Sequence, residues 1–182
     1  VDTTWNVNTG VTPTVTVTTS DTYDTEPSGA LTSGTWTYNV TFKKAGSWTI
    51  TADDIDATSP TYTSYVHSAI IIASGPAAKL QLLMPGETAA AGFSSGKTGT
   101  PINRTTGIPF TVTVNCVDAD WNVVTSGSNP QVSFSSTDTY ASLPAPNQSL
   151  VAGTKIFTNA VTYKTGTGSG WTLTVSDTDV IS

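Results

Sequence analysis

One seven-residue phrase occurs twice in this chain and limits its possible folds more than any other feature. Residues 1–7 read VDTTWNV and residues 117–123 read VDADWNV, so Trp121 follows Trp5 by 116 residues. Repetition at a long period indicates that one structural unit is used more than once. A fold prediction for this chain is therefore a prediction for one unit that occurs twice.

Further matches follow the phrase in the same order along both halves. The offset between matching residues grows from 117 to 119, 121 and 123 along the chain. The matching pairs are DTY at 21–23 and 138–140, LTSG at 31–34 and LVAG at 150–153, FK at 42–43 and YK at 163–164, and WTIT at 48–51 and WTLT at 171–174. Loop insertions in a shared fold produce such a gradual increase. We infer a repeat of about 120 residues.

Alternation of apolar and polar residues predicts that the repeat is built of β-strands. Residues 11–19, 36–42 and 110–116 alternate with a period of two, which is typical of strands with one buried face. Only 11% of the residues are charged, and Thr, Val and aromatic residues suit pleated strands. The pattern predicts an all-β fold in which 36–42 and 47–52 form a hairpin. Further strands are expected at 61–73 and 79–84.

A Ser-Gly-Pro break at 74–76 divides the chain into two expected domains. Residues 1–75 form a repeat that lacks its first strands, and residues 76–182 form one that lacks its last strand. A long loop rich in Gly, Ser and Thr is expected at 87–107. Two explanations of the missing strands stay open: the chain is a segment of a longer array, or neighbouring subunits supply the strands by strand addition.

The second copy carries a family resemblance. Residues 110–124 (FTVTVNCVDADWNVV), 131–134 (QVSF) and 171–175 (WTLTV) together resemble the bacterial immunoglobulin-like repeats of invasin- and intimin-type surface proteins. Those repeats commonly carry a D-x-x-G-N-x-V turn between strands, and Trp121 stands where their glycine is usual. The resemblance covers most of 77–182 and the later two-thirds of the repeat in 1–75.

The resemblance implies tandem Ig-like Greek-key β-sandwiches, export to the cell surface, and a structural or adhesive role in arrays. About seven short alternating strands per repeat independently suggest the same sandwich. We therefore expect an extracellular or cell-surface location.

Composition and motifs argue against several classes of function. The net charge is −6 and the basic residues are scattered, so a nucleic-acid surface is not expected. The longest apolar run, at 69–73, is too short to insert into a membrane. With His67 as the sole histidine and no nucleophile motif, we expect no enzymatic activity. The GKT at 96–98 lacks the spacing and context of a phosphate-binding loop.

Asp118, Asp120 and Asn122 are the candidate metal ligands, because they alternate in a turn and offer the oxygen ligands that Ca²⁺ prefers. The alternative is an Asx-rich turn whose side chains bond the backbone. The acidic loops at 53–56 and 177–179 recur at matching positions and are similar candidates. No other cofactor is expected. Cys116 is expected to be a small core residue, since it falls on the inward face of its strand.

Three sequons make Asn39, Asn103 and Asn147 candidate N-glycosylation sites. Trp5 and Trp121 lie in turns and are candidates for contact with a glycan, whereas Trp36, Trp48 and Trp171 fit inward positions.

The sequence thus predicts a structural module of an extracellular repeat protein, filament or surface layer. Its modules are expected to assemble head-to-tail as a homopolymer or repeat array, with strand complementation between subunits as one route. The alternative is an adhesin or carbohydrate-binding module at the cell surface.

Overall fold

The alternating segments form strands in the computed structural model, which describes residues 1–127, 129–166 and 168–179. This part of the chain contains twelve β-strands and no helix, and its paired strands run antiparallel. The prediction of an all-β fold is confirmed. In the described residues, no helix is long and apolar enough to cross a membrane. The chain divides into two compact units, Val1–Ala73 and Ser74–Ser182.

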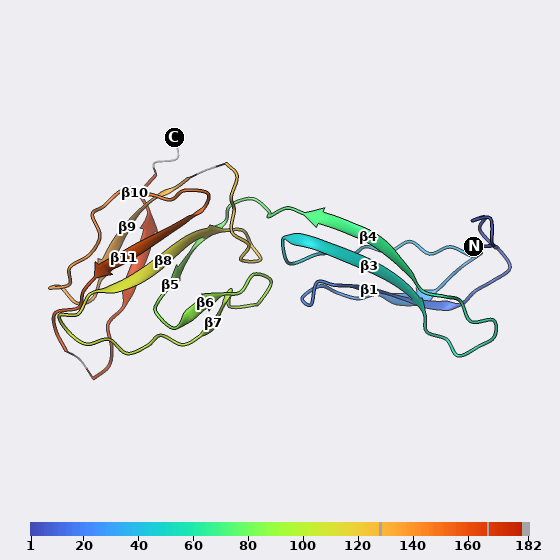
Figure 1. The fold of residues 1–182 in the computed structure, drawn as a ribbon, viewed down its shortest axis with the longest axis horizontal. Helices are drawn as coiled ribbons and strands as arrows, with labels where there is room; N and C mark the ends of the chain where they lie inside the picture. Colours follow the sequence, from blue (N-terminus) through green and yellow to red (C-terminus); the bar gives the residue numbers. More distant parts are fainter. Residues whose placement is uncertain (128, 167, 180–182) are drawn as a thin grey trace. The chain divides into compact units, whose positions relative to one another are not determined.

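The first unit contains one four-stranded sheet in the order β2-β1-β3-β4 (Figure 1). Its strands are β1 (Thr14–Thr19), β2 (Ser28–Ala30), β3 (Gly46–Asp54) and β4 (Tyr65–Ile72). The alternation places Val17, which is 1% exposed, on the buried face opposite Ala52 of β3. Both edges of β3 are paired, one with β1 and the other with β4.

The predicted hairpin between 36–42 and 47–52 is wrong. Residues 47–52 lie in β3, whose partners are β1 and β4, and residues 36–42 belong to no strand. The matching residues of the second unit do form a strand, because they pair with the strand at 110–117. The described part of the first unit contains no equivalent of that partner. The alternation of 36–42 is therefore present in the burial of its side chains, but neither the predicted strand nor its predicted partner is found.

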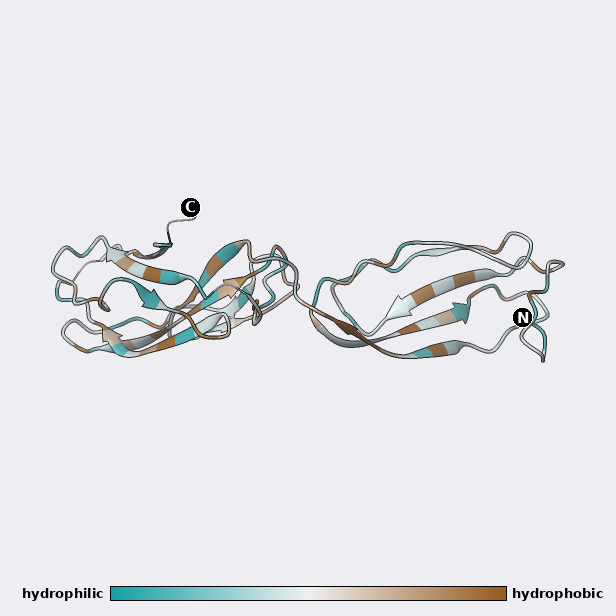
Figure 2. Ribbon diagram, turned by 90° about the horizontal axis from the view of Figure 1, so that it is seen from above, coloured by the Kyte–Doolittle hydropathy of each residue, from teal (hydrophilic) through white to brown (hydrophobic). Residues whose placement is uncertain are grey.

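The second unit contains two three-stranded sheets, ordered β11-β8-β5 and β10-β9-β12. Figure 2 shows apolar and polar bands alternating along these strands. Their bounds are β5 (Lys79–Leu83), β8 (Phe110–Val117), β9 (Gln131–Ser136), β10 (Gln148–Ser149), β11 (Thr154–Val161) and β12 (Leu173–Asp177). Strand β12 pairs with β9, and among the described residues its other edge has no strand partner.

The core of the second unit is built from side chains of both of its three-stranded sheets. Strand β8 contributes Phe110, Val112, Val114 and Cys116, which confirms the inward position predicted for Cys116. Side chains from the other strands and from adjacent loops complete this cluster: Val132, Leu150, Phe157, Val161 and Tyr163. Because β8 is the central strand of its sheet, its inward side chains are almost fully buried.

The stretch 87–107, predicted to be a loop, contains a short hairpin of β6 (Glu87–Ala89) and β7 (Lys97–Gly99). A salt bridge joins Lys97 Nζ to Glu87 Oε1 at 2.7 Å across it. Such short polar strands carry too little alternation to be recognised in the sequence.

Phe157 and Tyr38 occupy matching positions in the two units, and their burial differs. Phe157 is 5% exposed within the core, whereas Tyr38 is half-buried. Phe157→Ala is expected to lower the free energy of unfolding of the second unit by about 3–5 kcal/mol. Tyr38→Ala should cost the first unit about 1 kcal/mol, because less apolar area is returned to water. Scanning calorimetry of each variant measures both losses. Equal losses would contradict the conclusion that Phe157 is more deeply buried than Tyr38.

Candidate functional site

The repeated phrase forms a turn organised by a single carboxylate. In the second unit, Asp118 Oδ1 accepts hydrogen bonds from the backbone N–H groups of Asp120 and Asn122, each at 2.9 Å. Asp118 Oδ2 accepts from the N–H of Gly75 at 2.8 Å and from Asn122 Nδ2 at 2.9 Å. Asp118 is 4% exposed, so these bonds satisfy a buried charge. The turn is fixed by its own aspartate.

The first unit forms the same turn with its own copy of the phrase. Asp2 Oδ1 accepts from the N–H groups of Thr4 and Asn6, at 2.8 and 2.9 Å. Trp5 has a φ of 66° and Trp121 a φ of 69°, in the left-handed region that favours glycine. Both turns therefore place a tryptophan in a backbone conformation that glycine adopts more readily.

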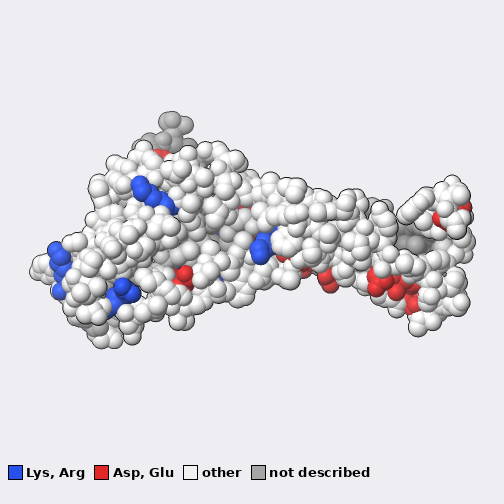
Figure 3. All heavy atoms as spheres, viewed as in Figure 1, with Lys and Arg blue, Asp and Glu red and all other residues white. Residues whose placement is uncertain are grey.

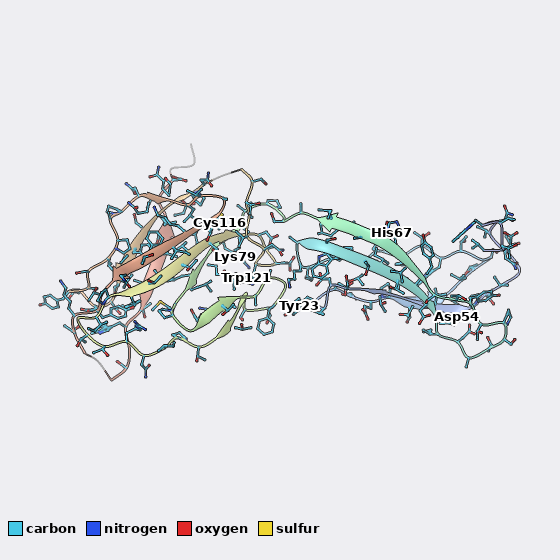
Figure 4. The ribbon with its side chains drawn as sticks, viewed as in Figure 1. Tyr23, Asp54, His67, Lys79, Cys116 and Trp121 are labelled. Carbon is cyan, nitrogen blue, oxygen red and sulfur yellow. The ribbon has the colours of Figure 1, made fainter. Side chains whose placement is uncertain are left out.

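The two tryptophans of these turns have different surroundings. Lys79 Nζ lies 3.6 Å from the centroid of the Trp121 ring, and Trp121 Nε1 donates to the Ser94 carbonyl at 3.2 Å (Figure 4). Gly96 packs against the same ring, where a Cβ would approach Trp121 Cδ2 to 2.1 Å. Trp5 is 70% exposed and meets Tyr65 edge-on. Trp121 is therefore a packing residue, while Trp5 stays available to a partner.

The predicted calcium ligands come together in this turn. The oxygens of Asp118 face N–H donors, Asn122 is buried against the same carboxylate, and Asp120 is half-buried. Donors around a carboxylate occupy the positions that a cation would need. No group of three or more His, Cys, Asp or Glu side chains suited to a metal occurs in the described residues. The geometry matches the Asx-rich turn.

The acidic loops also bind the backbone, and they do so in the same way in both units. Asp56 Oδ2 accepts from the N–H of Thr14 at 2.7 Å, and Asp179 Oδ2 accepts from the N–H of Gln131 at 3.0 Å. Each bond ties the end of the loop to the start of β1 or β9. Asp54, at the end of β3 in Figure 4, accepts from the N–H of Tyr62 at 3.0 Å.

A second pair of carboxylates, Asp21 and Asp138, anchors the chain after 36–42 and after β11. The sequence comparison aligns these two residues, but it does not predict their structural role. Asp21 Oδ2 accepts from the N–H groups of Lys43 and Lys44 at 2.8 and 2.9 Å. Asp138 Oδ2 accepts from the N–H of Lys164 at 2.7 Å. Asp21 is 1% and Asp138 2% exposed. The repeated DTY at 21–23 and 138–140 is the available signal, because an acidic residue that recurs after matching strands needs a structural reason.

These anchors hold residues 36–42 in place without pairing them. Within the described chain, residues 36–42 form no backbone–backbone hydrogen bond. Their side chains nevertheless alternate, with Trp36, Tyr38, Val40 and Phe42 half-buried and the residues between them exposed. The Trp36 and Tyr38 rings contact each other in a tilted arrangement, with centroids 4.7 Å apart. We call residues 36–42 the open edge, because their side chains alternate in burial and no strand of the first unit pairs with them.

A cavity of about 340 Å³ lies in the same unit and is lined in part by Val15, Leu31 and Ala52. The matching residues of the second unit are Val132, Leu150 and Val175, and the first two are 0% and 1% exposed. Val132 and Leu150 share one core with the inward side chains of β8. The cavity therefore corresponds to core positions that are filled in the second unit.

The candidate glycosylation sites do not cluster, and His67 and Cys116 lie apart from them in the sequence. Asn39, Asn103 and Asn147 are all exposed, and Asn39 lies on the outward side of the open edge. His67 is exposed on β4, with Nδ1 2.7 Å from the Ser68 carbonyl (Figure 4). Cys116 is buried, and burial followed by the charge of Asp177 raises the pKa of its thiol. A raised pKa disfavours the reactive thiolate.

Comparison of the chain with protein-family models, curated proteins and solved structures finds no match. The candidate site therefore rests on the geometry of the open edge and on the cavity of the first unit.

The Asp118 turn gives a prediction for acid stability. Burial by itself raises the pKa of Asp118, but hydrogen bonds from Asn122, Gly75 and Asp120 outweigh it and hold the pKa below the ordinary value of 3.8. The charged form therefore stabilises the second unit above about pH 4, and this contribution is lost as the pH falls through the folded-state pKa. Asp118→Asn should cost about 1–3 kcal/mol at pH 7, because an amide cannot accept every one of these bonds.

Calorimetry of the second unit's transition between pH 2 and pH 7 measures this effect. The difference between the wild-type chain and Asp118→Asn should shrink at the acidic end. Glu26→Gln, which alters an exposed carboxylate, is the matched control and should leave the profile unchanged. A difference that is constant with pH would contradict the role given to the Asp118 charge.

Proposed function

We propose that this chain is a structural module of an extracellular repeat protein, filament or surface layer whose neighbouring modules complete one another's sheets. The open edge of the first unit is the observation that carries the proposal. A tandem pair of Ig-like Greek-key sandwiches is the architecture that we propose for the complete modules. In support, the two three-stranded sheets of the second unit share one core, as the layers of a sandwich do.

Exposed edges and uncovered apolar faces are unfavourable in an isolated domain and promote pairing with another chain. The first unit has such a face beside residues 36–42, and the outer edge of β12 has no strand partner among the described residues. Strand β3 of the first unit matches β12 in the aligned repeat, and its corresponding edge is paired with β4. Two incomplete positions in one chain suit head-to-tail contacts, which propagate into arrays.

Self-association of the purified chain tests this function. The wild-type chain is expected to sediment increasingly as oligomers at raised concentration and to form chains in negative-stain electron micrographs. Val40→Asp should weaken this association by roughly tenfold or more, because it places a charge on the half-buried face of the open edge.

The matched control is Thr37→Asp, which adds the same charge to the exposed side of the same segment and should leave association unchanged. A chain that stays monomeric at every concentration would contradict assembly through its own copies. Equal effects of the two substitutions would show that the association uses another surface.

A hollow in the second unit supports the adhesin or carbohydrate-binding module as a second candidate. It measures about 510 Å³ and is lined in part by Asn103, Arg104, Tyr163 and Trp171. Tyr163 is 8% exposed, and its hydroxyl has no hydrogen-bond partner in the described part of the chain. Aromatic faces beside polar groups suit sugar rings.

A glycan array tests this candidate. Any specific signal should fall at least about tenfold in Arg104→Ala, because that change removes a charged hydrogen-bond donor from the hollow. Trp5→Ala, which alters a tryptophan outside this hollow, should retain the signal. A signal lost only in Trp5→Ala would place glycan binding on the first turn instead.

A further inference from the structure

The second unit contains the strand that the first unit lacks, and this identifies the kind of partner that the open edge accepts. We infer that the open edge binds, in antiparallel orientation, an uncharged strand from outside residues 1–75 with the alternating pattern of β8. The inference rests on the proposed function and deepens it, because it states the chemistry and register of the completing strand.

The pairing of β11 with β8 supplies the register. In the second unit, Lys155 pairs with Val114, Phe157 with Val112 and Val161 with Phe110. Trp36, Tyr38 and Val40 of the first unit match Lys155, Phe157 and Val161 in the aligned repeat. These three residues should therefore face the donor positions equivalent to Val114, Val112 and Phe110.

The open edge is better suited to a regular ladder than β11 itself. The register of β11 shifts between Phe157 and Val161, where four residue steps face two steps of β8. The first unit is two residues shorter in this region, since the repeat offset grows from 119 to 121 between Gly34 and Phe42. Two steps from Tyr38 to Val40 therefore face two steps of the donor, and no bulge is needed.

The cavity specifies the inward side chains of the donor. Val15 and Leu31 line it, and their counterparts Val132 and Leu150 are buried against the core that β8 completes. A donor with branched or aromatic residues at alternate positions would fill this space and cover the half-buried face of the open edge. Its outward residues need only be polar, as Thr111 and Thr113 are in β8.

The negative charge of the first unit also limits which donor strands can bind. The first unit contains seven acidic and two basic residues, and many of the carboxylates on the face seen in Figure 3 lie on it. Asp53 and Asp54 line the cavity. An acidic donor would be repelled and a charge at an inward position would be buried without a partner. The open edge, like β8, contains no charged residue.

A labelled peptide tests the inference on the full chain. The peptide has the sequence of residues 109–117 with Cys116→Ser, and fluorescence anisotropy measures its binding. We expect saturable binding to one site on the wild-type chain, at least about tenfold weaker binding to Tyr38→Asp, and binding within about twofold of wild type to Thr37→Asp. The calorimetric transition of the second unit shows that each variant keeps that unit folded.

Two altered peptides keep the test decisive even if Tyr38→Asp misfolds the first unit. One has lysine at the inward positions (Val112→Lys and Val114→Lys), and the other at the outward positions (Thr111→Lys and Thr113→Lys). Both have the same charge, so general attraction to an acidic unit would favour them equally. The inference requires the inward-lysine peptide to bind at least about tenfold more weakly to the wild-type chain.

Absent binding of the unaltered peptide, or equal binding of the two lysine peptides, would overturn the inference. If the chain still self-associates in that case, the proposed function stands and the open edge accepts a different partner. If the peptide binds as expected and the chain never self-associates, the inference stands and assembly through copies of this chain is contradicted.

Discussion

A strand needs a partner for the hydrogen-bonding groups of its backbone, and this requirement determines the difference between the two units. Residues 36–42 and β11 occupy matching positions, and both alternate in burial. Strand β11 is paired along β8, whereas the described part of the first unit has no such partner. Buried backbone groups must be paired, so an unpaired segment stays exposed on one side and its core stays open. The half-buried aromatic residues of the open edge and the cavity of the first unit follow from the lack of a strand equivalent to β8.

Carboxylates fix several turns and loop ends of the fold, and they do so by accepting hydrogen bonds from backbone N–H groups. Asp2 and Asp118 fix the turns of the repeated phrase, and Asp21 and Asp138 fix the chain after the open edge and after β11. The bonds that Asp21 accepts fix the chain directly after the open edge, which is itself unpaired. They also explain why acidic residues recur in a sequence with so few charges. Their role is structural, and they recur because both units need the same turns.

Much of the fold could be predicted from the sequence, because strand alternation is a local property. Alternation predicts the strand at 110–116 and the inward position of Cys116, and a strand is also expected at 79–84. The partner of 36–42 could not be, since pairing depends on residues far away in the chain and the nearest alternating segment was taken instead. The role of Asp21 and Asp138 was also missed, because a bond between a buried carboxylate and a distant backbone leaves no local pattern. Only the repetition of the tripeptide marked it.

Hydrogen exchange of the full chain, resolved to segments by mass spectrometry, tests the central claim most directly. The account predicts that backbone amides of residues 37–42 exchange roughly 100-fold faster than those of residues 155–161, because the former lack strand hydrogen bonds and the latter are paired with β8. Residues 47–52, within the paired strand β3, should be protected in the same experiment. Equal protection of 37–42 and 155–161 would show that the open edge is already paired, and it would contradict the account.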